Sequence, residues 1–357
     1  MSTEAIISVD VMGGDKGPAA MIAGLSRAAS KDEGLRFLLH GDETEIRRLV
    51  DKRRKLRDRV EIRHADDVVA MDEKPSRALR TGKNTSLWKA LEAVAAGDAH
   101  AALSCGNTGA IVAMAMLVLR KAPGIDRPAI AVHWPANNQN GFNVVLDMGA
   151  DVRADAENLV QYAIMGAEYS RLAFGVPEPR VGLLNVGTED TKGHPEQRDA
   201  KQRLTALTQS SEAGFRFNGF VEGTDILSDR IDVIVTDGFT GNIALKAAEG
   251  TASFIRRALK DAFSHSILSR FGALFAMGSF RRLRKRIDPR RVNGGVFLGL
   301  NGGVIKSHGG ADALGHASAV QLAAKIARND LTGLVTQRMS ELAASPGNPP
   351  PDSTSGT

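Results

Sequence analysis

The chain has 357 residues, of which 43% are hydrophobic and 24% charged, both ordinary fractions for a soluble globular protein. This length allows one large core or two modest ones. The single cysteine, Cys105, excludes an intramolecular disulfide and a cysteine-rich metal site. No export signal is visible, because the first residues lack a basic region and Asp10 and Asp15 interrupt the apolar stretch. We therefore expect a cytoplasmic protein.

The net charge of +5 is distributed unevenly. Residues 253–291 contain eleven Lys or Arg and two Asp, a net charge of +9, so the remainder of the chain carries −4. Aromatic residues make up only 5% of the chain, which leaves few stacking platforms for bases, and we expect no nucleic-acid partner. The longest apolar stretches, such as residues 110–119, are shorter than the roughly 20 residues that a membrane-spanning helix needs.

Short runs rich in β-branched residues alternate with segments of helical spacing. The predicted strands are residues 6–11, 37–39, 60–62, 101–104, 129–132, 144–146, 181–186, 232–235 and 295–298. Helical spacing is clearest in residues 19–29, 86–96, 156–174 and 199–210. This alternation predicts an α/β fold with a mostly parallel sheet between helices. We expect one catalytic domain over residues 1–344 and a disordered tail over residues 345–357, which have no apolar anchor.

Ligands of such sheets bind beyond the carboxyl ends of the strands, so the residues after each strand are candidates for a site. After the first strand, Gly13 and Gly14 let the backbone approach a ligand, and Asp15 precedes a helix start with Pro18 in its first turn. The N–H groups of a helix start favour an anion. A tight turn without a ligand explains a Gly-Gly pair about equally well.

After residues 101–104, Asn107 and Thr108 stand at a predicted helix start, which again suits phosphate. A simple N-cap is the commoner explanation of either residue. Cys105 could be a nucleophile, because thioester chemistry often uses cysteine. A small buried residue at a strand end is the more common case, and no His is nearby in the sequence.

Three later runs, residues 184–193, 236–242 and 299–309, combine Gly with Asn, Thr or Lys. The first contains Thr188 and Lys192, and the second contains Thr240 and Asn242. A lysine in so polar a stretch is usually only a solvated charge, and Asn242 could be a plain helix cap. The five strand-end runs together lack both a catalytic-triad signature and metal-ligand spacing. They are typical of a site that binds an anion and polarises a carbonyl with amide donors and a cation.

These motifs resemble those of the phosphate acyltransferase (PlsX) family. The matching stretches, in the family's order over residues 9–319, are DVMGGDKGP, CGNTGA, LDMGAD, NVGTEDTKG, VEGTDI, TDGFTGN and LGLNGGVIKSHGGAD. The resemblance implies a three-layer Rossmann-like fold related to phosphotransacetylase and to isocitrate and isopropylmalate dehydrogenases, and a homodimer. It implies transfer of a long-chain acyl group from acyl carrier protein to inorganic phosphate, without metal or cofactor. The acyl phosphate would pass to a membrane glycerol-phosphate acyltransferase.

By the same resemblance, Lys192 binds and orients phosphate, and Asn242 lies near the reacting carbonyl. The residues expected to complete the phosphate and substrate site are Gly13, Gly14, Asp15, Asn107, Thr108, Thr188 and Thr240. Residues 194–198 depart from the family pattern. A phosphotransacetylase acting on short acyl-CoA is the nearest alternative function, and a membrane-surface adaptor without enzymatic activity is the second.

Residues 253–286 are predicted to form a helical hairpin at the membrane surface. Apolar residues recur every three or four positions from Ile255 to Leu274, and basic residues cluster at 281–286. Such a segment can lie in an anionic lipid interface without spanning it. We expect Phe271, Leu274 and Phe275 to contact lipid. Packing of the stripe on the body or on a second subunit is the alternative.

Overall fold

The computed structural model describes residues 4–209, 213–286 and 294–343. The strands of the described residues form one eleven-stranded sheet with the order β3-β2-β1-β4-β11-β10-β5-β6-β9-β7-β8. Its strands are β1 (Ala5–Asp10), β2 (Leu35–Gly41), β3 (Val60–His64), β4 (Ala101–Ser104), β5 (Ala129–Pro135), β6 (Phe142–Leu146), β7 (Arg180–Leu184), β8 (Arg216–Val221), β9 (Val233–Val235), β10 (Gly295–Leu298) and β11 (Gly303–Lys306).

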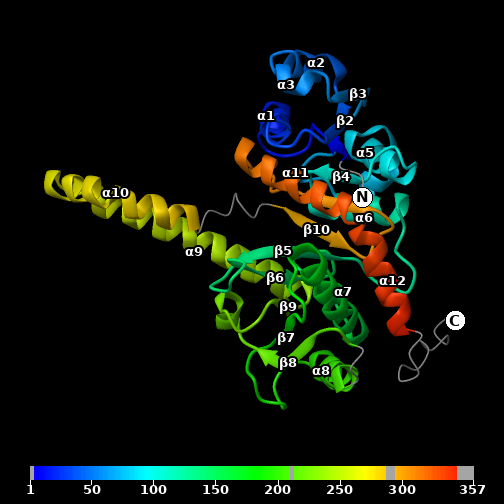
Figure 1. Ribbon diagram of the computed structural model, residues 1–357, viewed down its shortest axis with the longest axis vertical. Coiled ribbons are helices and arrows are strands. Elements are labelled where there is room, and N and C mark those ends of the chain that lie inside the picture. Colours follow the sequence, from blue (N-terminus) through cyan, green and yellow to red (C-terminus); the bar gives the residue numbers. More distant parts are fainter. Residues whose placement is uncertain (1–3, 210–212, 287–293, 344–357) are drawn as a thin grey trace.

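Helices cover both faces of this sheet, and one helical pair projects from the body (Figure 1). The helices are α1 (Gly17–Ala29), α2 (Glu43–Val50), α3 (Arg54–Arg57), α4 (Pro75–Thr81), α5 (Ser86–Ala95), α6 (Thr108–Val118), α7 (Ala156–Phe174), α8 (Pro195–Gln209), α9 (Gly238–Ser264), α10 (Ile267–Arg286), α11 (Ala313–Arg328) and α12 (Leu331–Ala343). Two short 3-10 helices span Gly82–Asn84 and Gly223–Leu227.

Two apolar clusters form the core, one on each face of the sheet. Neighbouring strand residues such as Val144 and Val145 belong to different clusters, because successive side chains of a strand point to opposite faces. One cluster packs the sheet against α1, α7, α8, α11 and α12, and the other packs it against α4, α5, α6 and the start of α9. The three-layer α/β arrangement predicted from the sequence is confirmed.

Two groups of parallel strands make up the sheet, and they run in opposite directions. β10 pairs antiparallel with β11 and with β5, and β5 pairs antiparallel with β6. The group β6, β9, β7 and β8 therefore runs opposite to β2, β1, β4 and β11. The carboxyl ends of the two groups therefore lie at opposite ends of their strands, so the residues that follow the strands belong to two sets of loops.

The sequence did not predict β8 and β11. β11 has four residues and follows a glycine-rich turn, so its alternation is too short to recognise. β8 is the edge strand, and its partly exposed residues include Arg216 and Asn218. Pairing with neighbouring strands, and not a recognisable local sequence pattern, makes these two segments β-strands.

The projecting pair consists of α9 and α10, which pack against each other through Phe263 and Phe280, with ring centroids 5.0 Å apart. A helical hairpin was predicted over residues 253–286, but its first helix begins much earlier, at Gly238. The apolar stripe is also not continuous on one helix, because the chain turns between Ser264 and Ile267. The tail over residues 345–357 and the side chains of Arg281 and residues 283–286 lie outside the described part.

The tight crossing of α1 and α11 gives a test of the packing. A Cβ on Gly24 would lie 2.4 Å from the Cβ of His316 and 3.2 Å from the backbone nitrogen of Ala317. We expect Gly24→Ala to lower the free energy of unfolding by about 1–3 kcal/mol, because the helices must move apart. Gly250→Ala, where a Cβ meets open space, should raise it by up to about 1 kcal/mol. Urea denaturation measures both, and an undiminished stability of Gly24→Ala would contradict the packing.

Candidate functional site

The loops that follow β1, β4 and β11 meet at one edge of the sheet. We call residues 11–16, 105–108 and 307–312 the first cluster. The Asp15 backbone donates to the Gly309 carbonyl at 3.0 Å, and the Ser307 backbone donates to the Ser104 carbonyl at 2.8 Å. Gly14 has φ 91° and lies so near Cys105 that a Cβ would be 2.6 Å from the sulfur. The structure thus brings Gly13, Gly14 and Asp15 beside the turn that leads into α6.

A buried carboxylate, Asp10, holds this turn. It accepts hydrogen bonds from Ser86 Oγ at 2.6 Å, from Ser104 Oγ at 2.7 Å and from the Gly13 backbone at 3.2 Å. Burial raises the pKa of Asp10, and these hydrogen bonds oppose the rise. A Cβ on Gly13 would lie 2.7 Å from the carboxylate, so a glycine is required there.

The contacts of Cys105 and Asn107 show the structural part that each side chain plays. Cys105 is buried and donates to the Gly13 carbonyl at 2.8 Å, and burial raises its thiol pKa to about 12. A thiol so reluctant to ionise is unsuited to nucleophilic attack. Asn107 is the N-cap of α6 and accepts from the Ala110 backbone at 3.0 Å. Its amide also donates to two carbonyls of residues 71 and 73, so its side chain serves structure, while Thr108 begins the helix.

A second group of loops follows β6, β7 and β9, and we call residues 147–151, 185–194 and 236–242 the second cluster. Its buried carboxylate is Asp147, which accepts from the backbone of Ile130 at 2.8 Å, Ala150 at 2.9 Å and Asp151 at 2.5 Å. Burial raises the pKa of Asp147 to about 6. Asp147 was not among the predicted site residues, although it lies in the motif LDMGAD.

Asn242 lies one turn inside α9 and is not its cap. The N-cap is Asp237, whose side chain accepts from the Thr240 backbone at 2.9 Å. A Cβ on Gly149, which has φ 121°, would lie 3.6 Å from the Asn242 Cβ, so the Asp147 loop passes close to this residue. The Asn242 side chain is exposed and has no hydrogen-bond partner in the described part of the chain, which leaves its amide available to a ligand.

Lys192 is exposed on the loop between β7 and α8. The Asn185 amide holds the two ends of this loop, donating to the carbonyls of Gly187 at 3.1 Å and Lys192 at 3.2 Å. The Lys192 ammonium pairs with Glu189 at 3.0 Å, and Thr188 is exposed beside them. Of residues 194–198, which depart from the family motif, residues 195–198 form the start of α8, after the loop that carries Lys192.

α9 connects the two clusters. It begins in the second cluster, and its third turn reaches the first, where the His308 ring lies 3.6 Å from the Glu249 carboxylate. Lys246 lies between Asn242 and Glu249 on the same face of α9 and pairs with Glu249 at 2.9 Å. The predicted site residues therefore fall into two groups that face each other along α9.

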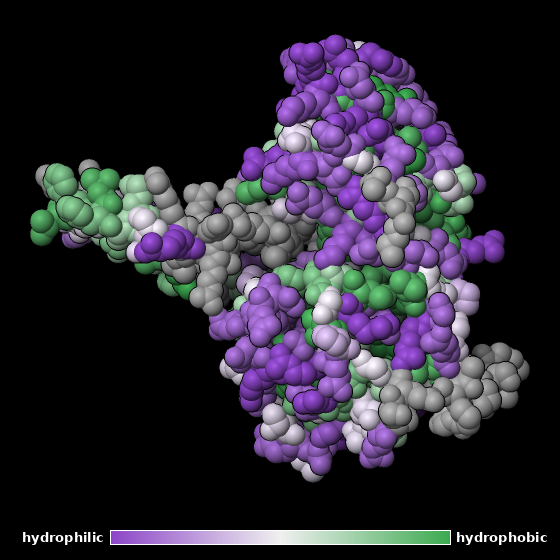
Figure 2. Space-filling view, in the orientation of Figure 1, coloured by the Kyte–Doolittle hydropathy of each residue, from purple (hydrophilic) through white to green (hydrophobic). Residues whose placement is uncertain are grey.

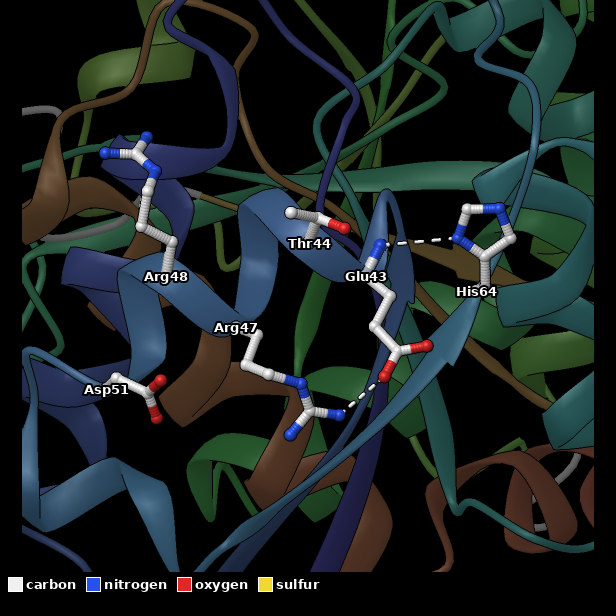
Figure 3. Close-up of a pocket in the computed structure, with 6 residues that line it drawn as sticks. All are labelled: Glu43, Thr44, Arg47, Arg48, Asp51 and His64. Atoms are coloured by element: carbon white, nitrogen blue, oxygen red, sulfur yellow. Dashed lines mark hydrogen bonds and ion pairs between the residues drawn. The ribbon is translucent and has the colours of Figure 1, made fainter.

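A surface hollow of about 560 Å³ lies elsewhere, between α2 and β3 (Figure 3). Glu43 pairs with Arg47 at 2.5 Å, and the Glu43 backbone donates to the His64 ring at 3.3 Å. Asp51 is paired as well, with Arg57 at 3.8 Å. The acidic groups of this hollow are therefore already matched by basic ones, and none of the predicted site residues lines it.

Comparison with known proteins decides the family. The model described as "Fatty acid synthesis protein" matches residues 5–333. The phosphate acyltransferase of Paracoccus denitrificans (strain Pd 1222) is 55% identical over 342 residues, which are 96% of this chain and 92% of the relative. The chain belongs to the phosphate acyltransferase family. The phosphate acyltransferase of Ruegeria sp. (strain TM1040) is 57% identical over 336 residues, 94% of this chain and 89% of that one.

A solved phosphotransacetylase from Streptococcus pyogenes has the same fold, with a TM-score of 0.60 over 92% of this chain and 95% of that chain, at 19% identity. The family, the fold related to phosphotransacetylase and the assignment as an acyltransferase enzyme, all predicted from the motifs, are confirmed. No helix in the described ranges combines the length and the apolar character needed to cross a membrane.

The raised pKa of Asp147 gives a test of the second cluster. A folded-state pKa of about 6, against about 3.9 for an unfolded aspartate, means that this group's contribution to stability is complete below about pH 4 and is lost as the pH rises through 6. In Asp147→Asn the side chain does not titrate. Its NH₂ group is a donor that faces a backbone N–H donor, and the lost hydrogen bond should lower the free energy of unfolding by about 1–3 kcal/mol. We expect the variant to be less stable than the parent at pH 5, with the gap narrowing toward pH 7. Urea denaturation at both pH values measures it, and a constant gap would contradict the assignment.

Proposed function

We propose that this acyltransferase moves a long-chain acyl group from acyl carrier protein to inorganic phosphate and releases an acyl phosphate for phospholipid synthesis. The observation that carries the proposal is identity above 50% over nearly the whole chain with enzymes named phosphate acyltransferase. The family model, described as a fatty acid synthesis protein, favours an acyl chain from fatty acid synthesis as the donor.

The chemistry needs few groups from the protein. A phosphate oxygen attacks the thioester carbonyl carbon, the C–O bond forms as the C–S bond breaks, and the proton lost by phosphate ends on the departing thiol. Because a thioester is already activated, the protein has to hold phosphate in line and stabilise the oxyanion. Lys192 and the amides at the start of α6 would hold phosphate, and the Asn242 amide would face the carbonyl oxygen. A buried, un-ionised Cys105 is compatible with direct attack by phosphate.

One assay separates this proposal from its alternatives. Purified protein is given phosphate with either palmitoyl–acyl carrier protein or acetyl-CoA, and acyl phosphate is trapped with hydroxylamine. We expect product from the first donor. Product from acetyl-CoA alone would support a phosphotransacetylase, and product from neither donor would leave only a non-enzymatic role.

Lys192 and Asn242 should affect different parts of the reaction. Lys192→Ala should lower turnover by roughly 100-fold and leave the KM for the acyl donor nearly unchanged, because the ammonium serves phosphate. Asn242→Ala should lower kcat at saturating phosphate by on the order of 100-fold, because it removes an oxyanion donor.

Lys89→Ala is the matched control, since Lys89 is a partly exposed lysine that pairs with Glu92 at i+3, as Lys192 pairs with Glu189. Thermal melting accompanies the kinetics. A folded Lys192→Ala with the parent's turnover would show that the site has been misplaced.

We propose that the far part of the α9–α10 hairpin contacts the membrane. Phe271, Leu274 and Phe275 are 57%, 59% and 91% exposed, and the far end of the hairpin is hydrophobic (Figure 2). Exposed apolar surface of this kind usually marks an interaction site. A long-chain acyl phosphate is insoluble in water. Its release at a lipid surface would therefore help its transfer to a membrane glycerol-phosphate acyltransferase. We also propose that the protein forms a homodimer and that it binds acyl carrier protein.

Vesicle co-sedimentation tests the membrane contact. We expect the parent to bind anionic liposomes, with binding that weakens as salt increases, and Leu274→Glu/Phe275→Glu to lose most of it. Thr251→Glu/Ala252→Glu adds the same charge at exposed positions of the hairpin without removing large apolar groups, and should retain most binding. Equal binding by all three proteins would exclude these side chains as the anchor.

A further inference from the structure

Lys306 is the last residue of β11 and directly precedes the 307–312 loop of the first cluster. β11 pairs in parallel with β4, which sets Lys306 beside Ser104. The loop that follows is fixed to both neighbouring loops, because Ser307 donates to the Ser104 carbonyl at 2.8 Å and the Gly309 carbonyl accepts from Asp15 at 3.0 Å. The side chain therefore starts from a rigid position at the carboxyl edge of the sheet.

The Lys306 ammonium is poorly compensated. Its one hydrogen bond in the described part of the chain is long, 3.4 Å to the carbonyl of the adjacent Ser307, and no carboxylate there lies within 4.0 Å of it. Burial lowers the pKa of Lys306, and the charge of Lys246 acts in the same direction, while Cys105, Asp15 and Glu249 act against it. Lys306 is only partly buried, and holding a partly buried cation without a close counter-ion is still unfavourable.

Two other lysines near the site, Lys192 and Lys246, differ from Lys306 because each has an acidic partner. Lys192 pairs with Glu189 at 3.0 Å, and Lys246 pairs with Glu249 at 2.9 Å. The contact between His308 and Glu249 at 3.6 Å fixes α9 beside the loop after Lys306. Unlike these two lysines, Lys306 has no close carboxylate in the described part of the chain, and the charges of Lys246 and Glu249 on α9 act on it.

We propose that Lys306 is a phosphate-binding residue whose ammonium pairs with the phosphate dianion between the two clusters. The inference rests on the proposed function for the identity of the ligand, and it assigns to the first cluster the cation that its amides lack. The folded chain provides no close counter-ion for Lys306, and bound phosphate would be that counter-ion. Binding of phosphate would therefore stabilise the charged form of Lys306.

The first test uses inorganic phosphate alone, without an acyl donor, and so does not depend on turnover. Phosphate should raise the melting temperature of the parent and of Lys325→Met but not of Lys306→Met. Lys325 is the matched control, because burial also lowers its pKa, but it lies on α11 over the Phe174 ring at 4.6 Å. In phosphate-free buffer Lys306→Met should melt at or above the parent temperature, since it removes a partly buried charge and nearly keeps the volume.

The second test uses turnover. Lys306→Met should raise the KM for phosphate by roughly 10- to 100-fold with the donor KM unchanged, and Lys306→Arg should restore part of the loss. If Lys306→Met melts and turns over with the parent's phosphate dependence, the inference is wrong. It is also wrong if Lys306 governs stabilisation by 4′-phosphopantetheine but not by inorganic phosphate. If no donor gives acyl phosphate, the proposed function is wrong. The effect of phosphate on the melting temperature would still test whether Lys306 binds phosphate.

Discussion

The close contact between the start of α9 and the Asp147 loop is the constraint on which the site depends. A Cβ on Gly238 would lie 2.6 Å from the Asp147 carboxylate, and one on Gly241 would lie 2.0 Å from its carbonyl oxygen. Only glycines allow the helix to begin there, and its direction then follows. From this start α9 carries Asn242 past Gly149, brings Glu249 to His308 and continues beyond the body into the hairpin. One straight helix thus sets the distance between the two clusters and links both to the exposed apolar surface.

Each half of the sheet uses the same device to hold its loops. Asp10 and Asp147 are both buried at or just after a strand end, and each binds backbone N–H groups of the loop that follows. A buried carboxylate without partners would be very unfavourable, so each one specifies the loop conformation that satisfies it. These residues do not need to touch a substrate. They explain why glycines follow them, because side chains on Gly13 or Gly238 would meet the carboxylates.

Much of the fold was predictable because its signals are local. The strands around the motifs, the long helix α7 and the hairpin all follow from periodicity and from residue type. The reversal of strand direction at β10 and β5 could not be predicted, because the direction of pairing is set by strands that lie far apart in the sequence. That reversal is also why the site residues form two clusters rather than one row. Among the site residues, the motif suggested Asn107 as a ligand, but its side chain caps α6. Asp147 was not predicted because its role depends on burial and on the backbone N–H groups that it binds. Lys306 was not predicted because its role depends on the lack of a close carboxylate. A single sequence shows neither property.

The charges of the site follow a consistent logic. Lys192 is exposed and already paired with Glu189, so an incoming dianion must compete with a carboxylate that costs little to release at the surface. Lys306 has no such partner, and its environment disfavours the charge that it carries. A mobile, screened cation is suited to capturing phosphate from solvent, and a fixed, desolvated one is suited to holding it in a single orientation. In the proposed reaction, Lys192 and Lys306 would face the attacking phosphate from the two clusters, and the Asn242 amide would be the neutral donor to the carbonyl oxygen. Such a division needs no nucleophilic side chain, and the buried thiol of Cys105 fits it as a packing residue.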